Sequence, residues 1–145
     1  MKTPMTYYGG KQTMLKHILP LIPEHSVYTE AFCGGAAVLF AKEPAPCEVL
    51  NDINAEIINF YWMGKCYYPE LKTEIDQMLH SRYQHDHATY IYNNPALFKP
   101  AERACAFWFL TKTSFASKLN GTFGFDLKGG MPKRLRNAKD AFTEE

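Results

Sequence analysis

Residues 27–41 read VYTEAFCGGAAVLFA, a run of β-branched and aromatic residues that ends in two glycines and continues into an apolar segment. This pattern predicts a strand over residues 27–32 and a helix over residues 36–41. Gly34 and Gly35 permit the sharp turn between the two elements, because glycine adopts backbone conformations that other residues avoid. The stretch therefore predicts a strand, a glycine turn and a helix in direct succession.

A second short strand is predicted over residues 47–50, and it ends at Asn51-Asp52. Asn54 is of the type that caps the N-terminus of a helix, and apolar residues at helical spacing follow it. A strand, a helix and a second strand in this order favour a βαβ unit, in which the two strands run parallel. The fold class that we expect is α/β.

Helices are expected on both sides of this unit. From Lys11, one helical face carries Met14, Leu15, Ile18 and Leu19, and Pro20 and Pro23 are expected to end that helix. Residues 70–98 are interpreted as helical and polar. Residues 101–110 are apolar on nearly every side, which predicts a buried helix. From Thr111 the chain is rich in Gly, Lys and Phe and shows little periodicity, so no regular element is predicted there.

Composition is typical of a globular domain, with 46% hydrophobic and 21% charged residues. No apolar run is long enough for a membrane-spanning helix, and the first residues lack a signal peptide, so we expect a cytoplasmic protein without membrane association. The four cysteines are scattered without a CxxC pair, and we interpret them as small core residues in a reduced compartment. His80, His85 and His87 are interpreted as a polar surface rather than a metal site, because residues two apart point in different directions on a helix.

Charge is uneven along the chain. Residues 1–111 contain nine Lys and Arg against eleven Asp and Glu, whereas residues 112–145 contain seven against four. A basic segment beside a mildly acidic body suits an enzyme edge that faces a polyanion. An exposed loop without a ligand explains the same charges equally well, and both interpretations stay open at this point.

The glycine turn and the acid after the second strand predict a nucleotide-type site. A strand that ends in glycines lets a ligand approach the backbone at the start of the next helix. Asp52 stands seventeen residues after Gly35, where a carboxylate accepts hydrogen bonds from both ribose hydroxyls of an adenosine cofactor. The GxGxxG pattern of dehydrogenases is missing, which argues against a nicotinamide cofactor.

Four motifs in order make the chain resemble the Dam-type family of DNA adenine-N6 methyltransferases. They are YYGGK at residues 7–11, TEAFCGG at residues 29–35, NDIN at residues 51–54, and FWFLTKTSF at residues 107–115 followed by GTFGF. Alanine occupies position 31, where the family usually has proline. The resemblance implies a Rossmann-like methyltransferase sheet, incomplete in this chain, with a mainly helical DNA-recognition insertion. It divides the chain into residues 1–68, part of the cofactor domain, and residues 69–145, part of the insertion.

The resemblance also implies which residues bind S-adenosylmethionine. Tyr7 and Lys11 are similar to the family's contacts to the methionine part, for which an aromatic face and an ammonium group suit a sulfonium and a carboxylate. Asp52 would hold the ribose. The implied cofactor set is Tyr7, Gly10, Lys11, Glu30, Phe32, Gly34 and Asp52. Purely structural roles remain open for three of these: packing for Tyr7, solvation for Lys11 and helix capping for Asp52.

Methyltransferases of this kind must extrude adenine from the duplex, so the implied partner is double-stranded DNA. Phosphates would be neutralised by Lys112, Lys118, Lys128, Lys133, Arg134 and Arg136, and base edges would be read by Ser117 or Asn120. A solubilising role for about half of these charges stays open.

The family's catalytic tetrapeptide, (Asp/Asn/Ser)-Pro-Pro-(Tyr/Phe/Trp), is absent, because no two of the nine prolines are adjacent. We therefore assign no catalytic residue, and we expect a fragment that is inactive alone and that needs its missing half or a second chain for stability. Two alternatives remain: a DNA- or cofactor-binding module that has lost catalysis, and an enzyme that methylates RNA or a small molecule. The biological role, whether restriction–modification, phage defence or housekeeping, is also open.

Overall fold

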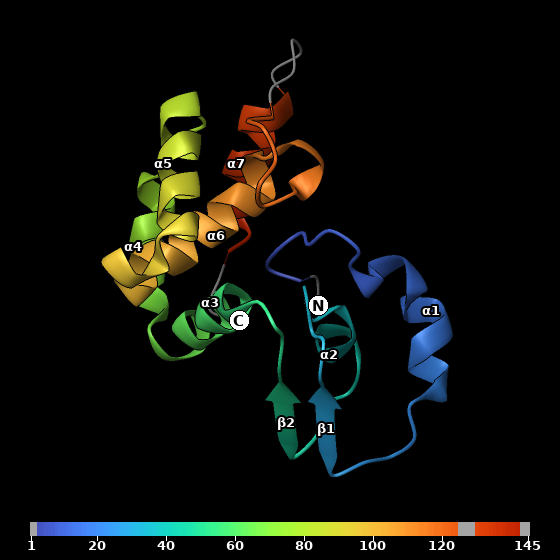
Figure 1. The fold of residues 1–145 in the computed structure, drawn as a ribbon. Helices are drawn as coiled ribbons and strands as arrows, with labels where there is room; N and C mark the ends of the chain where they lie inside the picture. Colours follow the sequence, from blue (N-terminus) through green and yellow to red (C-terminus); the bar gives the residue numbers. More distant parts are fainter. Residues whose placement is uncertain (1–2, 125–129, 143–145) are drawn as a thin grey trace.

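The computed structural model describes residues 3–124 and 130–142, which form a two-stranded sheet beside a larger group of helices (Figure 1). Short 3-10 helices are labelled η. In chain order the elements are η1 (Lys11–Met14), α1 (Leu15–Ile18), η2 (Leu19–Leu21), β1 (Val27–Glu30), α2 (Ala37–Ala41), β2 (Cys47–Leu50), α3 (Ala55–Cys66), α4 (Tyr68–Gln77), α5 (Arg82–Asn93), η3 (Pro95–Leu97), α6 (Pro100–Thr113), η4 (Phe115–Ser117) and α7 (Gly130–Asp140).

The predicted βαβ unit is confirmed. Strands β1 and β2 pair in parallel, with Val27 opposite Cys47 and Glu30 opposite Leu50, and α2 lies between them in the sequence. Strand β1 ends at Glu30 rather than Phe32, because the chain already turns toward α2 at that point. Asn54 caps α3 as predicted, since its side chain accepts a hydrogen bond from the Glu56 amide at 3.0 Å.

The core is built around α6, whose side chains are buried on almost every face, as the sequence predicts. Helices α3, α4 and α5 pack against α6. Phe107, Trp108 and Phe109 are fully buried. A partly buried ion pair between Glu56 of α3 and Arg103 of α6 joins these two helices, with Arg103 Nε donating to Glu56 Oε2 at 3.2 Å. Helix α3, which follows the sheet in the sequence, is thus anchored in the helical part.

Several sequence-based expectations need correction. Helix α7 is a regular element in a segment for which none was predicted: its sequence is mostly polar, but Leu135 and Ala138 lie three residues apart on one face and pack against the core. Helix α1 ends at Ile18, before Pro20, as expected, and the short helix η2 that contains Pro20 ends before Pro23. Cys33 and Cys105 are buried as expected, but Cys47 and Cys66 are exposed. In the ranges that the structure describes, no helix has both the length and the apolar character needed to cross a membrane.

Candidate functional site

Asp52 organises the turn at the carboxyl ends of the two strands. Its Oδ2 accepts a hydrogen bond from the Gly34 amide at 2.9 Å, and its Oδ1 accepts one from the Asn54 amide at 3.0 Å. One carboxylate therefore fixes both the glycine turn after β1 and the start of α3 after β2. Each carboxylate oxygen has a second lone pair, so Asp52 retains capacity to accept hydrogen bonds from a ligand.

Tyr7 packs directly on this glycine turn. Gly34 has a φ of +48°, and a Cβ there would lie 3.3 Å from Tyr7 Cδ1, so both backbone conformation and space favour glycine. The Tyr7 ring also faces Phe107 of α6, with ring centroids 6.3 Å apart. The Gly10 amide donates to the Tyr7 carbonyl at 3.1 Å, which closes the turn that leads into η1. The first motif and the glycine turn are therefore in contact.

Lys11 and Glu30 place opposite charges beside the end of β1. Lys11 Nζ donates to the Phe32 carbonyl at 2.8 Å. Glu30 is buried and accepts a hydrogen bond from the Tyr28 hydroxyl at 3.0 Å through Oε1, while its Oε2 is buried without a hydrogen-bond partner. Burial raises the pKa of the Glu30 carboxyl, although the Tyr28 hydrogen bond and the charges of Lys11 and Lys42 act in the opposite direction. Lys11, Glu30 and Phe32 line a cavity of about 320 Å³.

Contacts therefore link Tyr7, Gly10, Gly34 and Asp52 in one group, while Lys11, Glu30 and Phe32 line one cavity. Both groups lie at the carboxyl ends of β1 and β2. This is the edge where parallel α/β sheets ordinarily bind ligands. The residue types fit a ligand that carries a carboxylate, a positive charge and a ribose: an ammonium group, an unpartnered buried carboxylate oxygen and an acid that binds the glycine turn. The arrangement can hold such a ligand close to the backbone at Gly34.

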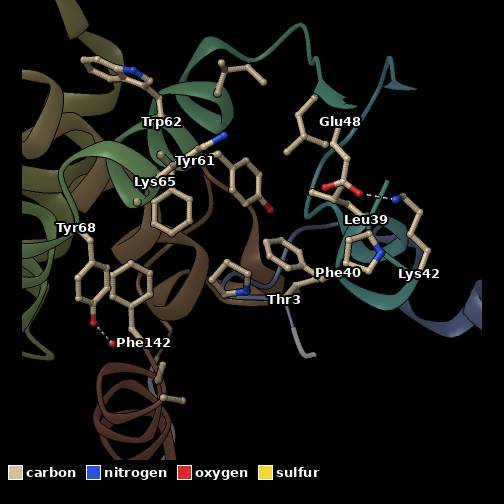
Figure 2. A pocket seen from close by; sticks show the side chains of 18 of the residues that line it. Thr3, Leu39, Phe40, Lys42, Glu48, Tyr61, Trp62, Lys65, Tyr68 and Phe142 are labelled. Atoms are coloured by element: carbon tan, nitrogen blue, oxygen red, sulfur yellow. Dashed lines mark hydrogen bonds and ion pairs between the residues drawn. The ribbon is translucent and has the colours of Figure 1, made fainter. Parts of the chain in front are cut away.

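A larger cavity of about 880 Å³ lies between α2, β2, α3 and the end of α7 (Figure 2). Phe40, Tyr61 and Phe142 give it an apolar lining, and the Tyr68 hydroxyl at its rim donates to the Phe142 carbonyl at 2.8 Å. The Tyr61 hydroxyl is buried without a hydrogen-bond partner among the described residues. None of the seven predicted cofactor residues lines this cavity, so it is a separate feature of the molecule.

Residues 114–124, which we call the α6–α7 loop, form a small hairpin. Ser114 and Phe123 form an antiparallel bridge, and the Phe115 amide donates to the Thr122 carbonyl at 2.8 Å. Ala116 and Ser117 both adopt left-handed conformations, with φ of 55° and 56°. Such conformations are unfavourable for residues with a Cβ, and they cluster at functional sites. Phe115 is 70% exposed at the start of the turn.

The structure separates the predicted DNA contacts into three groups. Ser117, Lys118 and Asn120 lie together in the α6–α7 loop, and Arg134 and Arg136 are exposed on α7 with Lys133. Lys112 instead lines the large cavity, with Nζ 5.7 Å from the centre of the Trp108 ring. Burial, and after it the charge of Arg134, lowers the pKa of the Lys112 ammonium group to about 8. Lys128 lies outside the described residues.

Two exposed aromatic residues at this surface were not singled out in the sequence. Phe115 projects from the loop, and Tyr8, 65% exposed, lies beneath Lys118 with Nζ 5.5 Å from its ring centre. Their motifs predict roles for the nearby Tyr7 and Lys112 from side-chain chemistry. The exposure of an aromatic side chain, in contrast, cannot be predicted from the sequence around it. Lys118 thereby connects the loop to the segment that carries Tyr7.

The histidines of α5 correct another expectation. His85 and His87 point in different directions, as predicted, because His85 faces Phe123 whereas His87 is exposed and faces Phe98. His85 is buried, however, at 3% exposure, and so does not belong to a polar surface. In the part of the chain that the structure describes, no three potential metal ligands gather.

Comparison with known proteins gives a consistent result. The model of the D12 class N6 adenine-specific DNA methyltransferase family matches residues 7–138. The chain is 44% identical over 54 residues to the type II methyltransferase M1.LlaDCHI of Lactococcus lactis subsp. cremoris, a stretch that covers 37% of this chain and 19% of that protein. It is 43% identical over 53 residues to the DNA N-6-adenine-methyltransferase of Escherichia phage P1, covering 37% of this chain and 7% of the relative. Modification methylase StsI of Streptococcus sanguinis is 38% identical over 58 residues, 39% of this chain and 9% of that protein.

Proposed function

This chain belongs to the D12 class of N6 adenine-specific DNA methyltransferases, and on that premise we propose that it supplies the S-adenosylmethionine site and part of the DNA-reading surface of such an enzyme. The observation that carries the proposal is the Asp52 carboxylate, which holds the Gly34 amide at 2.9 Å at the carboxyl ends of two parallel strands. The matched stretches cover no more than 19% of these relatives, so the activity of the whole enzyme is part of the proposal.

Enzymes of this family generally use S-adenosylmethionine, whose sulfonium supplies the methyl group. In this chain Asp52 would bind the ribose, and Lys11 would bind the carboxylate of the methionine part. Glu30, with its unpartnered Oε2, would favour the positively charged end of the cofactor. Tyr7 would keep Gly34 and the backbone around it in place for close approach of the ligand. These residues bind and orient the cofactor.

DNA would be bound by the α6–α7 loop and by α7. Lys118, Arg134 and Arg136 have the charge to neutralise phosphates, which positions a duplex without reading its sequence. Ser117 and Asn120 carry the donors and acceptors that read base edges. Phe115, an exposed apolar side chain at a tight turn, suits contact with bases that have been unstacked. Lys112 faces the cavity and would contribute charge from a distance.

We expect the purified chain to bind S-adenosylmethionine and duplex DNA but to form no N6-methyladenine. Cofactor and DNA groups are present, whereas the tetrapeptide that contacts the target amino group is missing from residues 1–145. Labelled cofactor and unmethylated duplex would be incubated with the chain and the DNA analysed by mass spectrometry. Duplex affinity, measured by fluorescence anisotropy, should fall with salt, and a Lys118→Ala, Arg136→Ala variant should reduce the slope of log affinity against log salt by about two.

Lys16→Ala provides the control, because Lys16 is an exposed lysine of α1 outside the proposed surface. It should leave the salt slope unchanged. Methylated product at a defined sequence would show that residues in this chain replace the missing tetrapeptide. Preference for duplex RNA over duplex DNA would contradict the proposed substrate.

We further propose that additional strands, from a second chain or from a longer polypeptide, complete the sheet. Parallel sheets are ordinarily covered on both faces, and two isolated parallel strands are not stable alone. Here Val27 and Val49 are 58% and 43% exposed, and the large apolar cavity lies beside β2. Among the described residues, no further strand joins β1 and β2. The Rossmann-like sheet and the division at residue 68 belong to the same proposal.

This proposal predicts that the isolated chain self-associates as its concentration rises. Val49→Lys should reduce the association, because a lysine on an edge strand opposes pairing with another chain. Sedimentation velocity over a range of concentrations measures the effect. Leu97→Lys, at an apolar position of η3 that lies outside the sheet and is even more exposed (68%), should leave association unchanged. A chain that stays monomeric at every concentration and melts cooperatively would count against the proposal.

A further inference from the structure

Both ends of the α6–α7 loop are held by side chains that the proposed function does not use. His85 Nε2 and Ser114 Oγ share a hydrogen bond of 3.0 Å at the first residue of the loop, and both residues are buried. His80 Nε2 donates to the Gly124 carbonyl at 3.1 Å at the last residue. The two histidines belong to α5 and to the turn before it, so one segment contacts both ends of the hairpin.

Phe123 is packed among three side chains from this same segment. Its ring centroid lies 4.7 Å from that of His80 and 5.6 Å from that of His85, and Arg82 Cζ lies 5.5 Å from its centre. We call His80, Arg82 and His85 the histidine clamp. The clamp contacts Ser114, Phe123 and Gly124, which lie at the two ends of the loop.

The loop needs such anchoring because its turn is conformationally unfavourable. Ala116 and Ser117 occupy the left-handed region although both carry a Cβ. A Cβ at Gly121 would lie 2.9 Å from the Lys118 carbonyl, so the chain is also closely packed across the turn. Conformations of this kind persist only where surrounding contacts determine them. At the base of the hairpin these contacts are the clamp and the backbone hydrogen bond from the Gly124 amide to the Thr113 carbonyl at 2.6 Å.

We infer that the histidine clamp holds the α6–α7 loop in its DNA-reading conformation, and that gain of a proton by His85 releases the loop and weakens DNA binding. His80, Arg82 and His85 are positioning residues, because they act through the backbone of the loop and not on the substrate. The inference rests on the proposed DNA-binding function. It adds a role for the Tyr- and His-rich segment that the motifs of the family do not explain.

The direction of the pH effect follows from the surroundings of His85. Burial lowers the pKa of the His85 imidazole. The charged and titratable groups that face it among the described residues are Asp86, Arg82 and His80, while Ser114 and Phe123 on the α6 side do not titrate. Asp86 Oδ1 lies 3.7 Å from Nδ1, too far for a hydrogen bond, and Nδ1 has no hydrogen-bond partner. The Asp86 charge raises the pKa of His85, but the larger effect of burial keeps it lowered.

In the released loop, His85 regains an ordinary pKa near 6.5 and binds a proton more tightly than in the clamped state. The clamp is therefore fully effective above about pH 6.5 and is progressively lost as the pH falls below that value. The Gly124 carbonyl only accepts, so its hydrogen bond from His80 Nε2 is kept at both pH values. The loss depends on His85, whose Nδ1 is buried without a hydrogen-bond partner. General electrostatics predicts the opposite trend, because newly charged histidines strengthen binding to DNA.

Duplex affinity of the chain would be measured by fluorescence anisotropy at about pH 7.5 and about pH 5.5, with hydrogen exchange of the Phe115 and Gly124 amides as a second readout. For the unmodified chain we expect affinity to fall by about five- to tenfold at the lower pH, together with loss of protection at both amides. His85→Gln keeps a hydrogen-bonding side chain that does not titrate. It should retain most of the affinity at the higher pH and lose the pH dependence.

His87→Gln is the matched control, since His87 is an exposed histidine of the same helix that does not contact the loop. It should behave like the unmodified chain. Binding that strengthens at the lower pH, or an identical pH profile in His85→Gln, would overturn the inference. If the loop amides lose protection at low pH but the chain binds no DNA, the proposed DNA function is refuted. The pH-dependent hold of the clamp on the loop would then still be supported.

Discussion

Replacing Asp52 by alanine is expected to lower the affinity for S-adenosylmethionine by about a hundredfold. The substitution removes the carboxylate proposed to bind the ribose hydroxyls. It also leaves the amides of Gly34 and Asn54 without the acceptor that they have in this structure. Both losses act in the same direction, because the glycine turn is the part of the backbone that the cofactor approaches. Isothermal titration calorimetry with S-adenosylmethionine measures the change.

Two further variants separate the binding role of Asp52 from its structural role. Asp52→Asn keeps one carbonyl oxygen for the turn but removes the charge, so an intermediate affinity is expected. Glu43→Ala makes the same change of charge at an exposed position between α2 and β2 and should have no effect. If folded Asp52→Ala protein bound the cofactor as tightly as the unmodified chain, Asp52 would be only a cap for the turn.

Phe107→Ala is expected to reduce the free energy of unfolding by about 3–5 kcal/mol. Phe107 is fully buried, and its ring faces those of Tyr7, Phe60 and Tyr92, with centroids 6.3, 6.2 and 6.5 Å away. Truncation would leave a cavity where Tyr7, α3, α5 and α6 meet. Denaturation in urea, followed by circular dichroism, measures the loss.

Phe115→Ala serves as the matched control, because it makes the same truncation at a side chain that is 70% exposed. Its effect on the free energy of unfolding should stay within about 0.5 kcal/mol. Equal stability of Phe107→Ala and the unmodified chain would show that this aromatic group does not form the core described for α6.

The sequence predicts the parts of this fold that depend on local patterns. The parallel strands, the Asn54 cap and the buried helix α6 all follow from residue type and spacing within a short window. Helix α7 was missed because most of its residues are polar and its apolar face, with Leu135 and Ala138, is narrow. The different burial of the four cysteines was also missed, because the burial of a small residue depends on which elements pack against it.

The same distinction applies to the candidate site: residues in local motifs can be predicted from the sequence, whereas contacts between distant segments cannot. Lys11, Gly34 and Asp52 were predicted because their motifs order them along the chain, and the structure places them at one edge of the sheet, while their role in cofactor binding stays a prediction. Lys112 shows the limit of such reasoning: its charge suggests a phosphate contact, whereas its position on α6 directs it to the large cavity. The clamp on the α6–α7 loop joins His85 to Ser114, and no local pattern predicts a contact between residues so far apart in the sequence.

The contact of Lys118 with the ring of Tyr8 gives the two proposed ligands a common segment. Tyr8 follows Tyr7, which packs on the glycine turn. If one ligand orders this segment, binding of the other ligand would cost less conformational entropy. Such coupling is reciprocal by thermodynamic necessity: if the cofactor raises the affinity for DNA by some factor, DNA raises the affinity for the cofactor by the same factor. If both proposed sites bind their ligands, this contact predicts cooperative loading, in which cofactor and duplex would each favour the binding of the other.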